Sequence, residues 1–469
     1  MADAQMKAED LQKMGVPHGK PTRLAQEFMA RFRLKGGAVS ALRSEVQAIL
    51  DAPAQFLEDP LRSAFAKAMS GVSVFALGKS VPWKQWGSNL DEESVKQMER
   101  ACQLPISVQG ALMPDAHLGY GLPIGGVLGT EGAVIPYAVG VDIACRMKLS
   151  VVDIPVSDLQ RKNDQLTRAI HAETRFGIGA SFKKKRQHVV MDEDWEVSPV
   201  TRHLKDKAWS QLGTSGSGNH FVEFGTFELH EEIKGLMPGT YVALLSHSGS
   251  RGTGAQVCSR YSKLAMEAHP ELPRSLRHLA WLDLNSEDGI EYWNAMELMG
   301  QYAAANHACI HHHILEHLGI NLMLDVENHH NFAWKERHCI DGKERDLIVH
   351  RKGATPAGEG VLGIIPGSMA APGFLVRGKG STKSLHSASH GAGRVMSRKR
   401  AMKSLEWGPV NKQLKEKKIT LMSAGLDEVP MVYKDIHQVM AAQSDLVETL
   451  GRFEPRIVKM APHGERPED

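Results

Sequence analysis

Two kinds of signal are missing from this 469-residue sequence: those of a disulfide-bonded protein and those of a membrane protein. The five cysteines are scattered, odd in number and form no CxxC pair, which argues against a disulfide framework and indicates a reducing compartment. No run of about 18 apolar residues occurs. The first residues, MADAQMKAEDLQKMG, carry charges where a signal peptide needs an apolar stretch. We therefore expect a soluble, cytoplasmic protein with no membrane partner.

The net charge of +2 hides two local basic runs. One spans Lys183 to Arg186, and the other follows a histidine motif with Arg394 and the stretch from Arg398 to Arg400. Both are candidate phosphate contacts, although an isolated basic run is more often a solvated face. The second run adjoins a histidine, which favours a function for it. The 44 glycines gather in the histidine-bearing segments, where close approach of the backbone to a ligand would explain them.

The chain is long enough for one large domain or two modest ones, and its 42% hydrophobic content can fill a large core. Residues 1–70 have apolar positions at three- and four-residue spacing and are expected to form a helical extension without chemistry of its own. From about residue 105, short apolar runs broken by Gly and Pro indicate strands joined by loops. Two periodic stretches, 157–176 and 286–320, are expected to be helices that serve packing.

Most of the 23 histidines are expected to be ordinary surface or core residues. His307, His311, His312, His313 and His317 lie on one expected helix, where spacing of four residues can suit a metal ion. No HExxH glutamate accompanies them, so we interpret this group as structural.

A different set of side chains supplies carboxylate, thiolate and imidazole groups, which together suit a two-metal phosphoryl-transfer centre. Each histidine of the set stands in a segment marked by Gly or Asn, and the carboxylate and thiolate stand three residues apart in VGVDIACRM. A thiolate in such a turn can bridge two cations while the other groups complete the two coordination shells. The set consists of Asp142, Cys145, His220, His247, His330 and His390.

His390 carries an additional signal, because Gly391, Ala392, Gly393 and Arg394 follow it. Backbone N–H groups and a guanidinium can surround a phosphate there, while an imidazole with an ordinary pKa near ~6.5 is mostly neutral at cytoplasmic pH. This favours a histidine that attacks phosphorus. The alternative is a fifth metal ligand.

These segments resemble one known family, the RtcB family of RNA ligases, from about residue 70 to 460. The matching pieces, in the order of the family, are MPDAHLGYGLPIGG, GVDIAC, GSGNHFVE, HSGSRG, VHRKGATP, PGSM, SHGAGRVMSR and VPMVYKDI. The resemblance implies an α+β fold with mixed and antiparallel sheets, flanked by helices around a deep central metal cleft. It also implies a catalytic domain over residues 71–469, two Mn²⁺ ions, GTP or GMP as the nucleotide, and an archease-like activator as a possible partner.

The resemblance further assigns individual roles. Cys145 would bridge two Mn²⁺ ions, one completed by Asp142 and His220 and the other by His247 and His330. His390 would be the residue that becomes guanylylated. The basic residues expected to contact RNA phosphates are Arg251 and Arg394. The guanylate pocket would be formed by Asn219, His220, Phe221, Val222, Glu223, His330, Asn331, Pro366, Gly367, Ser368, Met369, His390, Gly391, Ala392, Gly393, Tyr433 and Lys459.

The activity implied is GTP- and Mn²⁺-dependent joining of RNA 2′,3′-cyclic-phosphate or 3′-phosphate ends to 5′-hydroxyl ends, in RNA repair or tRNA processing. The alternative is a dinuclear-metal RNA phosphatase or cyclic phosphodiesterase that uses the same centre without guanylylation. A catalytically silent RNA-binding module is disfavoured, because every expected ligand is present. The chain departs from the family after PGSM, where residues 370–373 (AAPG) replace a Gly-Thr-x-Ser-like stretch and so lack its second hydroxyl group.

Overall fold

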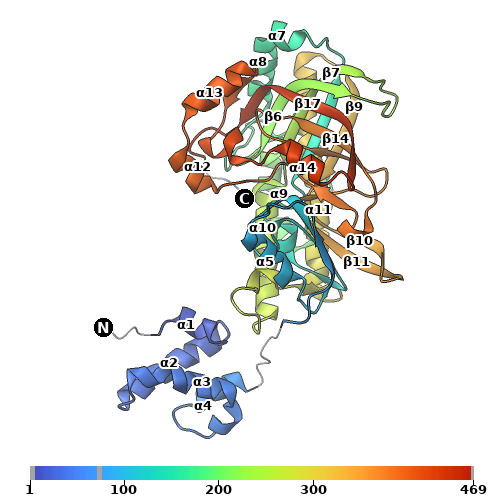
Figure 1. Ribbon diagram of the computed structural model, residues 1–469. Coiled ribbons are helices and arrows are strands. Elements are labelled where there is room, and N and C mark those ends of the chain that lie inside the picture. The colour runs from blue at the N-terminus through green and yellow to red at the C-terminus, as the bar shows by residue number, and fades with distance from the viewer. Residues whose placement is uncertain (1–5, 71–76, 466–469) are drawn as a thin grey trace.

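The structure is a computed structural model that describes residues 6–70 and 77–465. Its elements form a helical unit at the N-terminus and a larger body of sheets and helices (Figure 1). The fold class predicted for the chain, α+β with mixed and antiparallel sheets, is confirmed. Among the residues described, no helix combines the length and the apolar character needed to span a membrane.

The N-terminal unit has a hydrophobic core of its own. In its longest helix Ala25, Phe28 and Met29 are buried at the three- and four-residue spacing seen in the sequence, and they face Phe65 and its neighbours. The described part of this region, residues 6–70, contains four α-helices, and its role as a separate extension stays a prediction. The four helices are α1 (Ala8–Lys13), α2 (Lys20–Leu34), α3 (Leu42–Asp51) and α4 (Ser63–Met69).

The body contains two large sheets. The first has five strands, antiparallel except where β1 pairs with β2. Its strands in spatial order are β1 (Trp83–Gln85), β2 (Ser107–His117), β3 (Ile124–Thr130), β11 (Lys343–Lys352) and β10 (Asn331–Ile340). Two small pairs accompany the large sheets: β4 (Ala133–Val134) with β8 (Leu282–Asp283), and β12 (Ala354–Pro356) with β15 (Ser387–Ser389).

The second sheet has eight strands and curls so that its two edges approach each other. The side chain of Asn328 on one edge strand bridges the gap: it accepts from Ile364 N at 2.8 Å and donates to Ile364 O at 3.3 Å. The strand order is β13 (Leu362–Ile365), β14 (Gly373–Gly378), β17 (Val447–Met460), β6 (Phe221–Leu229), β7 (Gly239–Ser248), β5 (Arg146–Val152) and β9 (Leu322–His329), with β16 (Thr420–Ser423) paired to β17.

Helix α11 (Glu287–Leu318) covers one face of this curled sheet and packs against α8 (Asn163–Glu173) and α10 (Arg251–Ala268). It begins after Ser286, whose hydroxyl accepts from Gly289 N, and ends at Gly319, which adopts a left-handed conformation that suits glycine. His307 and His311 of this helix bond to the buried hydroxyl of Ser246, in keeping with a structural role. The remaining helices are α5 (Glu92–Ala101), α6 (Pro136–Val139), α7 (Asp158–Arg161), α9 (Pro199–Gln211), α12 (Arg398–Ser404), α13 (Trp407–Glu416) and α14 (Ile436–Ala442).

One residue joins the two large sheets. The chain leaves the eight-stranded sheet at the end of β9 and enters the five-stranded sheet at the start of β10, with His330 between them. Its backbone N–H donates to Cys145 O at 2.9 Å, and its carbonyl accepts from Ala354 N at 3.2 Å. The backbone of His330 is thus fixed from both sides, at the point where the expected site residues meet.

Candidate metal and nucleotide site

Four of the expected ligands lie at the same end of four neighbouring strands. In the order β6, β7, β5 and β9, neighbours are antiparallel, so the start of one strand lies beside the end of the next. The residues at these ends are His220, His247, Cys145 and His330. Because paired strands are separated by about 4.8 Å, four side chains at adjacent strand ends can meet in one cluster. The strand register therefore explains how segments far apart in sequence form one site.

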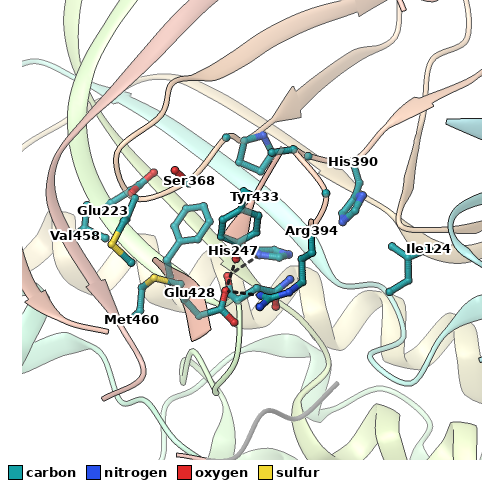
Figure 2. A pocket seen from close by; sticks show the side chains of 18 of the residues that line it. Ile124, Glu223, His247, Ser368, His390, Arg394, Glu428, Tyr433, Val458 and Met460 are labelled. Carbon is teal, nitrogen blue, oxygen red and sulfur yellow. Dashed lines mark hydrogen bonds and ion pairs between the residues drawn. The ribbon is translucent and has the colours of Figure 1, made fainter. Parts of the chain in front are cut away.

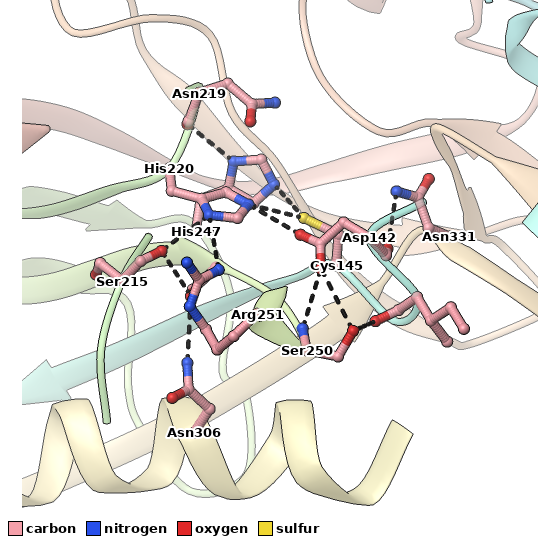
Figure 3. Close-up of polar contacts among 12 residues, drawn as sticks. Asp142, Cys145, Ser215, Asn219, His220, His247, Ser250, Arg251, Asn306 and Asn331 are labelled. Atoms are coloured by element: carbon pink, nitrogen blue, oxygen red, sulfur yellow. Dashed lines mark hydrogen bonds and ion pairs between the residues drawn. The ribbon is translucent and has the colours of Figure 1, made fainter. Parts of the chain in front are cut away.

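The side-chain atoms of this cluster are in close contact (Figure 3). Cys145 Sγ lies 3.1 Å from His247 Nε2 and 3.4 Å from His220 Nε2. His220 Nε2 is 3.0 Å from Asp142 Oδ2, and His247 Nε2 is 3.2 Å from His330 Nε2. Cys145, His220 and His247 form a buried group whose ligand atoms could hold a metal ion. The structure thus brings together all five residues expected to bind metal.

The other ring nitrogens set the tautomers of two of these histidines. His220 Nδ1 lies 2.8 Å from Ser215 O, and His247 Nδ1 lies 3.1 Å from Asn219 O. Because a carbonyl oxygen only accepts, Nδ1 of His247 carries the proton and its Nε2 presents a lone pair to the cluster. For His220, the contact of Nδ1 with Ser215 O is shorter than its 3.3 Å contact with Arg251 Nη1, which favours the same tautomer. Such outer contacts are typical of histidines that ligate metals.

The donor set fits one or more divalent transition-metal ions. His220 Nε2 and Asp142 Oδ2 are both acceptors at 3.0 Å, a repulsive contact that a cation between them would relieve. Burial lowers the pKa of His247 to about 3 and that of His330 well below its usual value, so both rings are neutral, as ligands must be. A mixed set of thiolate, carboxylate and imidazole groups is compatible with Mn²⁺.

Asp142 is oriented by the loop that follows β7. Its Oδ1 accepts from Ser250 N at 3.0 Å. A Cβ atom at Gly249 would lie 2.2 Å from the carboxylate oxygens, so only glycine allows this approach.

His390 lies next to the cluster, with its ring centroid 5.0 Å from that of His330. Its Nδ1 is 2.7 Å from Asp115 Oδ2, and the same oxygen accepts from its backbone N–H at 3.2 Å. Asp115 is fully buried. Burial alone raises the pKa of Asp115, but the hydrogen bond from His390 and the charge of Lys434 lower it overall. The ionised carboxylate therefore holds the Nδ1 proton and leaves Nε2 of His390 with its lone pair.

A cleft of about 750 Å³, here called the nucleotide pocket, opens on one side of His390 (Figure 2). Glu223 and His390 lie at opposite ends of it. Thirteen lining residues are among those expected for a guanylate pocket or a metal site: Asn219, Phe221, Glu223, His247, Pro366, Gly367, Ser368, Met369, His390, Gly391, Ala392, Gly393 and Tyr433. In the segment after Ser368, Lys417 Nζ donates to Ala370 O at 2.7 Å.

A second cavity, of about 850 Å³, lies on the other side of His390. Its walls include the cluster residues Asp142, Cys145, His220 and His330, with Asn331. Three residues expected in the guanylate pocket, His220, His330 and Asn331, therefore face this second cavity. His390 and Asn219 line both spaces.

Two expected pocket residues point elsewhere. Side chains alternate along a strand, so Phe221 and Glu223 face the nucleotide pocket while Val222 lies in the core beneath α11. Val222 pairs with Lys459, which shares its face of the sheet. Lys459 Nζ accordingly lies 3.1 Å from Thr174 Oγ1 instead of in the pocket, and burial lowers the pKa of this lysine to about 8.

The two arginines expected to contact RNA phosphates have partners within the protein. Arg251 is buried, and its Nη1 lies 3.3 Å from His220 Nδ1. Arg394 lines the nucleotide pocket, where it contacts Glu428 Oε2 at 3.3 Å and donates to Asp427 O at 2.7 Å. In the isolated basic run, Arg186 is also buried and is paired with Glu173 at 2.9 Å.

Two residues of the site were not identified from the sequence. Asp115 stands in the segment MPDAHLGYGLPIGG, and the acidic residue within that glycine-rich stretch is the signal that was available. Glu428 lines the nucleotide pocket while nearly fully buried, and it bonds to Tyr433 and to Arg398 as well as to Arg394. Glu428 directly precedes the segment VPMVYKDI, which contains its partner Tyr433, whereas its two arginine partners come from another segment.

Fold and site together define an α+β protein in which a cluster of thiolate, carboxylate and imidazole groups, suited to metal binding, lies beside a pocket large enough for a nucleotide. The family model described as tRNA-splicing ligase RtcB matches residues 97–197 and 192–460. The chain belongs to the RtcB family. Its first 96 residues lie outside the matched ranges.

Curated relatives agree with this assignment. The RNA-splicing ligase RtcB of Escherichia coli strain K12 is 33% identical over 408 residues, which cover 79% of this chain and 95% of that protein. The tRNA-splicing ligase RtcB of Methanococcus maripaludis is 32% identical over 449 residues, covering 80% of this chain and 92% of the relative. That of Archaeoglobus fulgidus is 31% identical over 417 residues, covering 74% and 86%.

Proposed function

We propose that the protein is an RNA ligase that joins 2′,3′-cyclic-phosphate or 3′-phosphate RNA ends to 5′-hydroxyl ends, using GTP and Mn²⁺, in RNA repair or tRNA processing. Membership of the RtcB family supports the RNA ligase activity. The observation that carries the finer proposal is the position of His390. It is held by Asp115 on the wall shared by the nucleotide pocket and the cavity of the ligand cluster.

In the first step, Nε2 of His390 attacks the α-phosphorus of GTP. A phosphorus–nitrogen bond forms, the bond to the bridging oxygen breaks, and pyrophosphate leaves. Asp115 keeps the Nδ1 proton in place, so the lone pair stays on Nε2 and the positive charge that develops on the ring is stabilised. Residues 391–393 and Arg394 line the same pocket as His390.

A cyclic-phosphate end first reacts with water, which breaks the bond between phosphorus and the 2′-oxygen and leaves a 3′-phosphate and a 2′-hydroxyl. In the second step, an oxygen of the RNA 3′-phosphate attacks the phosphorus bound to His390, and the electron pair of the phosphorus–nitrogen bond returns to Nε2. In the third step, the 5′-hydroxyl oxygen attacks the 3′-phosphate, loses its proton and expels GMP. His390 can serve both partners because it borders two spaces, one for the nucleotide and one open to the ligand cluster.

The metal ions would be held by Asp142, Cys145, His220, His247 and His330. When bound, Mn²⁺ stabilises negative charge on phosphate oxygens. The cysteine ligand requires a reduced thiol, and all five cysteines of the chain are free, which supports a cytoplasmic location. An archease-like activator stays a prediction.

Recognition of guanine is proposed for Glu223. This carboxyl group lies at the end of the nucleotide pocket opposite His390, and burial raises its pKa well above the usual value. Guanine presents two adjacent N–H donors, N1–H and N2–H, and their binding would favour the ionised form of this carboxyl group, in which both oxygens accept. Adenine presents an acceptor at N1 and is disfavoured at the same place.

Incubation with GTP labelled at the α-phosphorus, in the presence of Mn²⁺, tests the proposal. The wild-type protein should acquire a covalent label that is stable in alkali and lost in acid, as expected for a phosphoramidate. His390→Ala should acquire none, while His437→Ala, an exposed histidine outside the site, should label normally. A label retained by His390→Ala would exclude this nucleophile. Hydrolysis of 3′-phosphate or cyclic ends without any label would favour the alternative, a dinuclear-metal phosphatase or cyclic phosphodiesterase.

A further inference from the structure

The second cavity has an exposed apolar rim that the chemistry described so far does not use. Leu118 and Tyr120 both line this cavity, and they are 57% and 65% exposed. They lie in the loop between β2 and β3, on the same cavity as Asp142 and Cys145. An exposed aromatic and an exposed leucine beside a polar catalytic centre are costly to leave in water and typically mark a binding surface.

The rim is held in place by contacts on its inner side. The ring of Tyr120 meets that of His278 edge-on, with centroids 5.5 Å apart, and His278 packs in the same way against Tyr137 at 4.7 Å. The backbone carbonyl of Tyr120 accepts a hydrogen bond from Lys352 Nζ at 2.5 Å. These contacts hold the loop from inside while the Tyr120 side chain stays mostly exposed.

Lys352 adds a charge argument to this geometry. It lines the same cavity, is 7% exposed, and forms no ion pair with a carboxylate within residues 6–70 and 77–465. A buried ammonium group without a counter-charge is costly, and burial lowers its pKa to about 8. An anion in the cavity would offset that cost. The cavity thus combines the aromatic ring of Tyr120, the buried ammonium group of Lys352 and the side chains expected to bind metal.

We propose that Tyr120 and Leu118 form a shelf that stacks the nucleobase of the RNA nucleotide carrying the 3′-phosphate, with that phosphate inside the second cavity between His390 and Lys352. A nucleotide supplies both parts that the cavity lacks, a flat apolar ring for the shelf and an anion for the lysine. The inference rests on the proposed RNA ligase function. It deepens that function by assigning the terminal base its own subsite, which is read by stacking and tolerates all four bases.

The test uses the full-length protein with Mn²⁺ and a short RNA that ends in a 3′-phosphate, with fluorescent 2-aminopurine as its last base. Wild-type protein should quench this fluorescence on binding, because stacking on tyrosine quenches 2-aminopurine. Tyr120→Ala should weaken binding about 10- to 100-fold and abolish the quench, while Tyr120→Trp should retain both. The control Met237→Ala changes another exposed apolar residue, 59% exposed before β7, and should bind like wild type.

A second arm changes the ligand instead of the protein. An RNA whose last nucleotide lacks its base should bind wild type about as weakly as the complete RNA binds Tyr120→Ala, and Tyr120→Ala should not distinguish the two RNAs. Equal affinity of wild type for both RNAs overturns the proposal, even if the tyrosine variant fails to fold. Labelling of His390 by GTP should be unchanged in Tyr120→Ala. If the wild-type protein acquires no label from GTP, that result contradicts the proposed function. RNA binding is measured without GTP, so the two proposals can fail separately.

Discussion

Asp115 and His390, 275 residues apart in sequence, share a 2.7 Å hydrogen bond between a fully buried carboxylate and an imidazole ring. The same carboxylate oxygen also accepts from the backbone N–H of His390, so the ring is fixed relative to its own backbone. The pair places the unprotonated nitrogen of His390 toward the reacting phosphorus in the proposed mechanism. Asp115 acts through His390 and is therefore a positioning residue.

Asp115→Asn should slow guanylylation of His390 by about 10- to 150-fold, since a charge-assisted hydrogen bond contributes about 1.5–3 kcal/mol. The amide can still accept from Nδ1 but provides no negative charge for the developing imidazolium. The measurement is single-turnover labelling with GTP at saturating concentration, so that the rate of the step is separated from GTP binding. The KM for GTP should change little. A variant that labels at the wild-type rate would show that Asp115 has no such role.

Cys145→Ser should lose most of its bound metal, with affinity reduced by at least about 10- to 100-fold, because a neutral hydroxyl is a poorer ligand than a thiolate. Metal content after dialysis against Mn²⁺ measures the effect directly. Cys258→Ser is the matched control. Cys258 is also buried but lies within α10, where burial raises its pKa to about 11, and its replacement should be nearly silent. Near-normal Mn²⁺ content in Cys145→Ser would count against a thiolate ligand.

Glu223→Gln should raise the stability of the nucleotide-free protein and lower its preference for GTP over ATP. The raised pKa of Glu223 means that the folded protein favours the neutral carboxyl, so ionisation above the ordinary pKa destabilises the fold as pH rises. The uncharged amide avoids this cost, and the nucleotide-free variant should melt at a higher temperature than wild type at pH 8. Its preference for GTP over ATP in the labelling reaction should fall at least about tenfold. Unchanged selectivity would remove Glu223 from guanine recognition.

Glu336→Gln tests an ion pair remote from the site. Arg351 is almost fully buried and contacts Glu336 at 2.7 Å. Burial raises the pKa of Glu336, but the hydrogen bond from His338 and the charge of Arg351 lower it to about 2. A lowered carboxyl pKa gives stability that is complete above the ordinary value near 4.5 and is lost as pH falls toward 2. The variant should be about 3 kcal/mol less stable at pH 7.

Denaturation with urea at pH 7 and at pH 3.5 checks the sign of this effect. The difference between wild type and Glu336→Gln should shrink at the lower pH, because wild type then loses part of the contribution of the ionised carboxylate. A difference that stays constant or grows would contradict the assignment.

Removal of residues 1–76 should leave a folded, guanylylating protein, in line with the proposed boundary at residue 70. The N-terminal unit has its own core, and the family model matches from residue 97 onward. An ion pair joins Glu9 to Arg274 of the body at 3.2 Å, but both side chains are about two-thirds exposed, so it contributes at most about 1 kcal/mol. The melting temperature and labelling rate of the truncated protein provide the readout. Aggregation of the truncated protein would instead indicate one cooperative unit.

Local features of the fold could be predicted because their causes are local. The periodic stretch 286–320 corresponds to α11 at Glu287–Leu318, and the stretch 157–176 contains α7 and α8. The apolar spacing of both is set within a few turns of the chain. The short strands were also signalled, but much of their pairing was not, since neighbours such as β6 and β17 or β5 and β9 come from segments far apart in sequence.

Within the site, the sequence identified side chains by their glycine-marked segments but carried no information on strand register. Val222 and Lys459 illustrate this: they pair across β6 and β17, and both face away from the nucleotide pocket. The burial of Arg251 next to His220 could not be predicted from the sequence either. The local sequence around an arginine in a glycine-rich loop does not distinguish contact with a ligand from contact with another residue of the protein. Asp115 was missed because its partner lies in a distant segment.

Because His330 lies between the two large sheets, the geometry of the ligand cluster depends on how these sheets are oriented relative to each other. The chain has no spare residue at this crossing, since β9 ends at His329 and β10 begins at Asn331. A rotation of one sheet relative to the other would move the imidazole of His330 relative to Cys145 and His247, which both lie at strand ends of the eight-stranded sheet. Occupancy of the cluster by a cation would therefore lock the relative orientation of the two halves of the body, so that loading with metal and rigidity of the scaffold rise together.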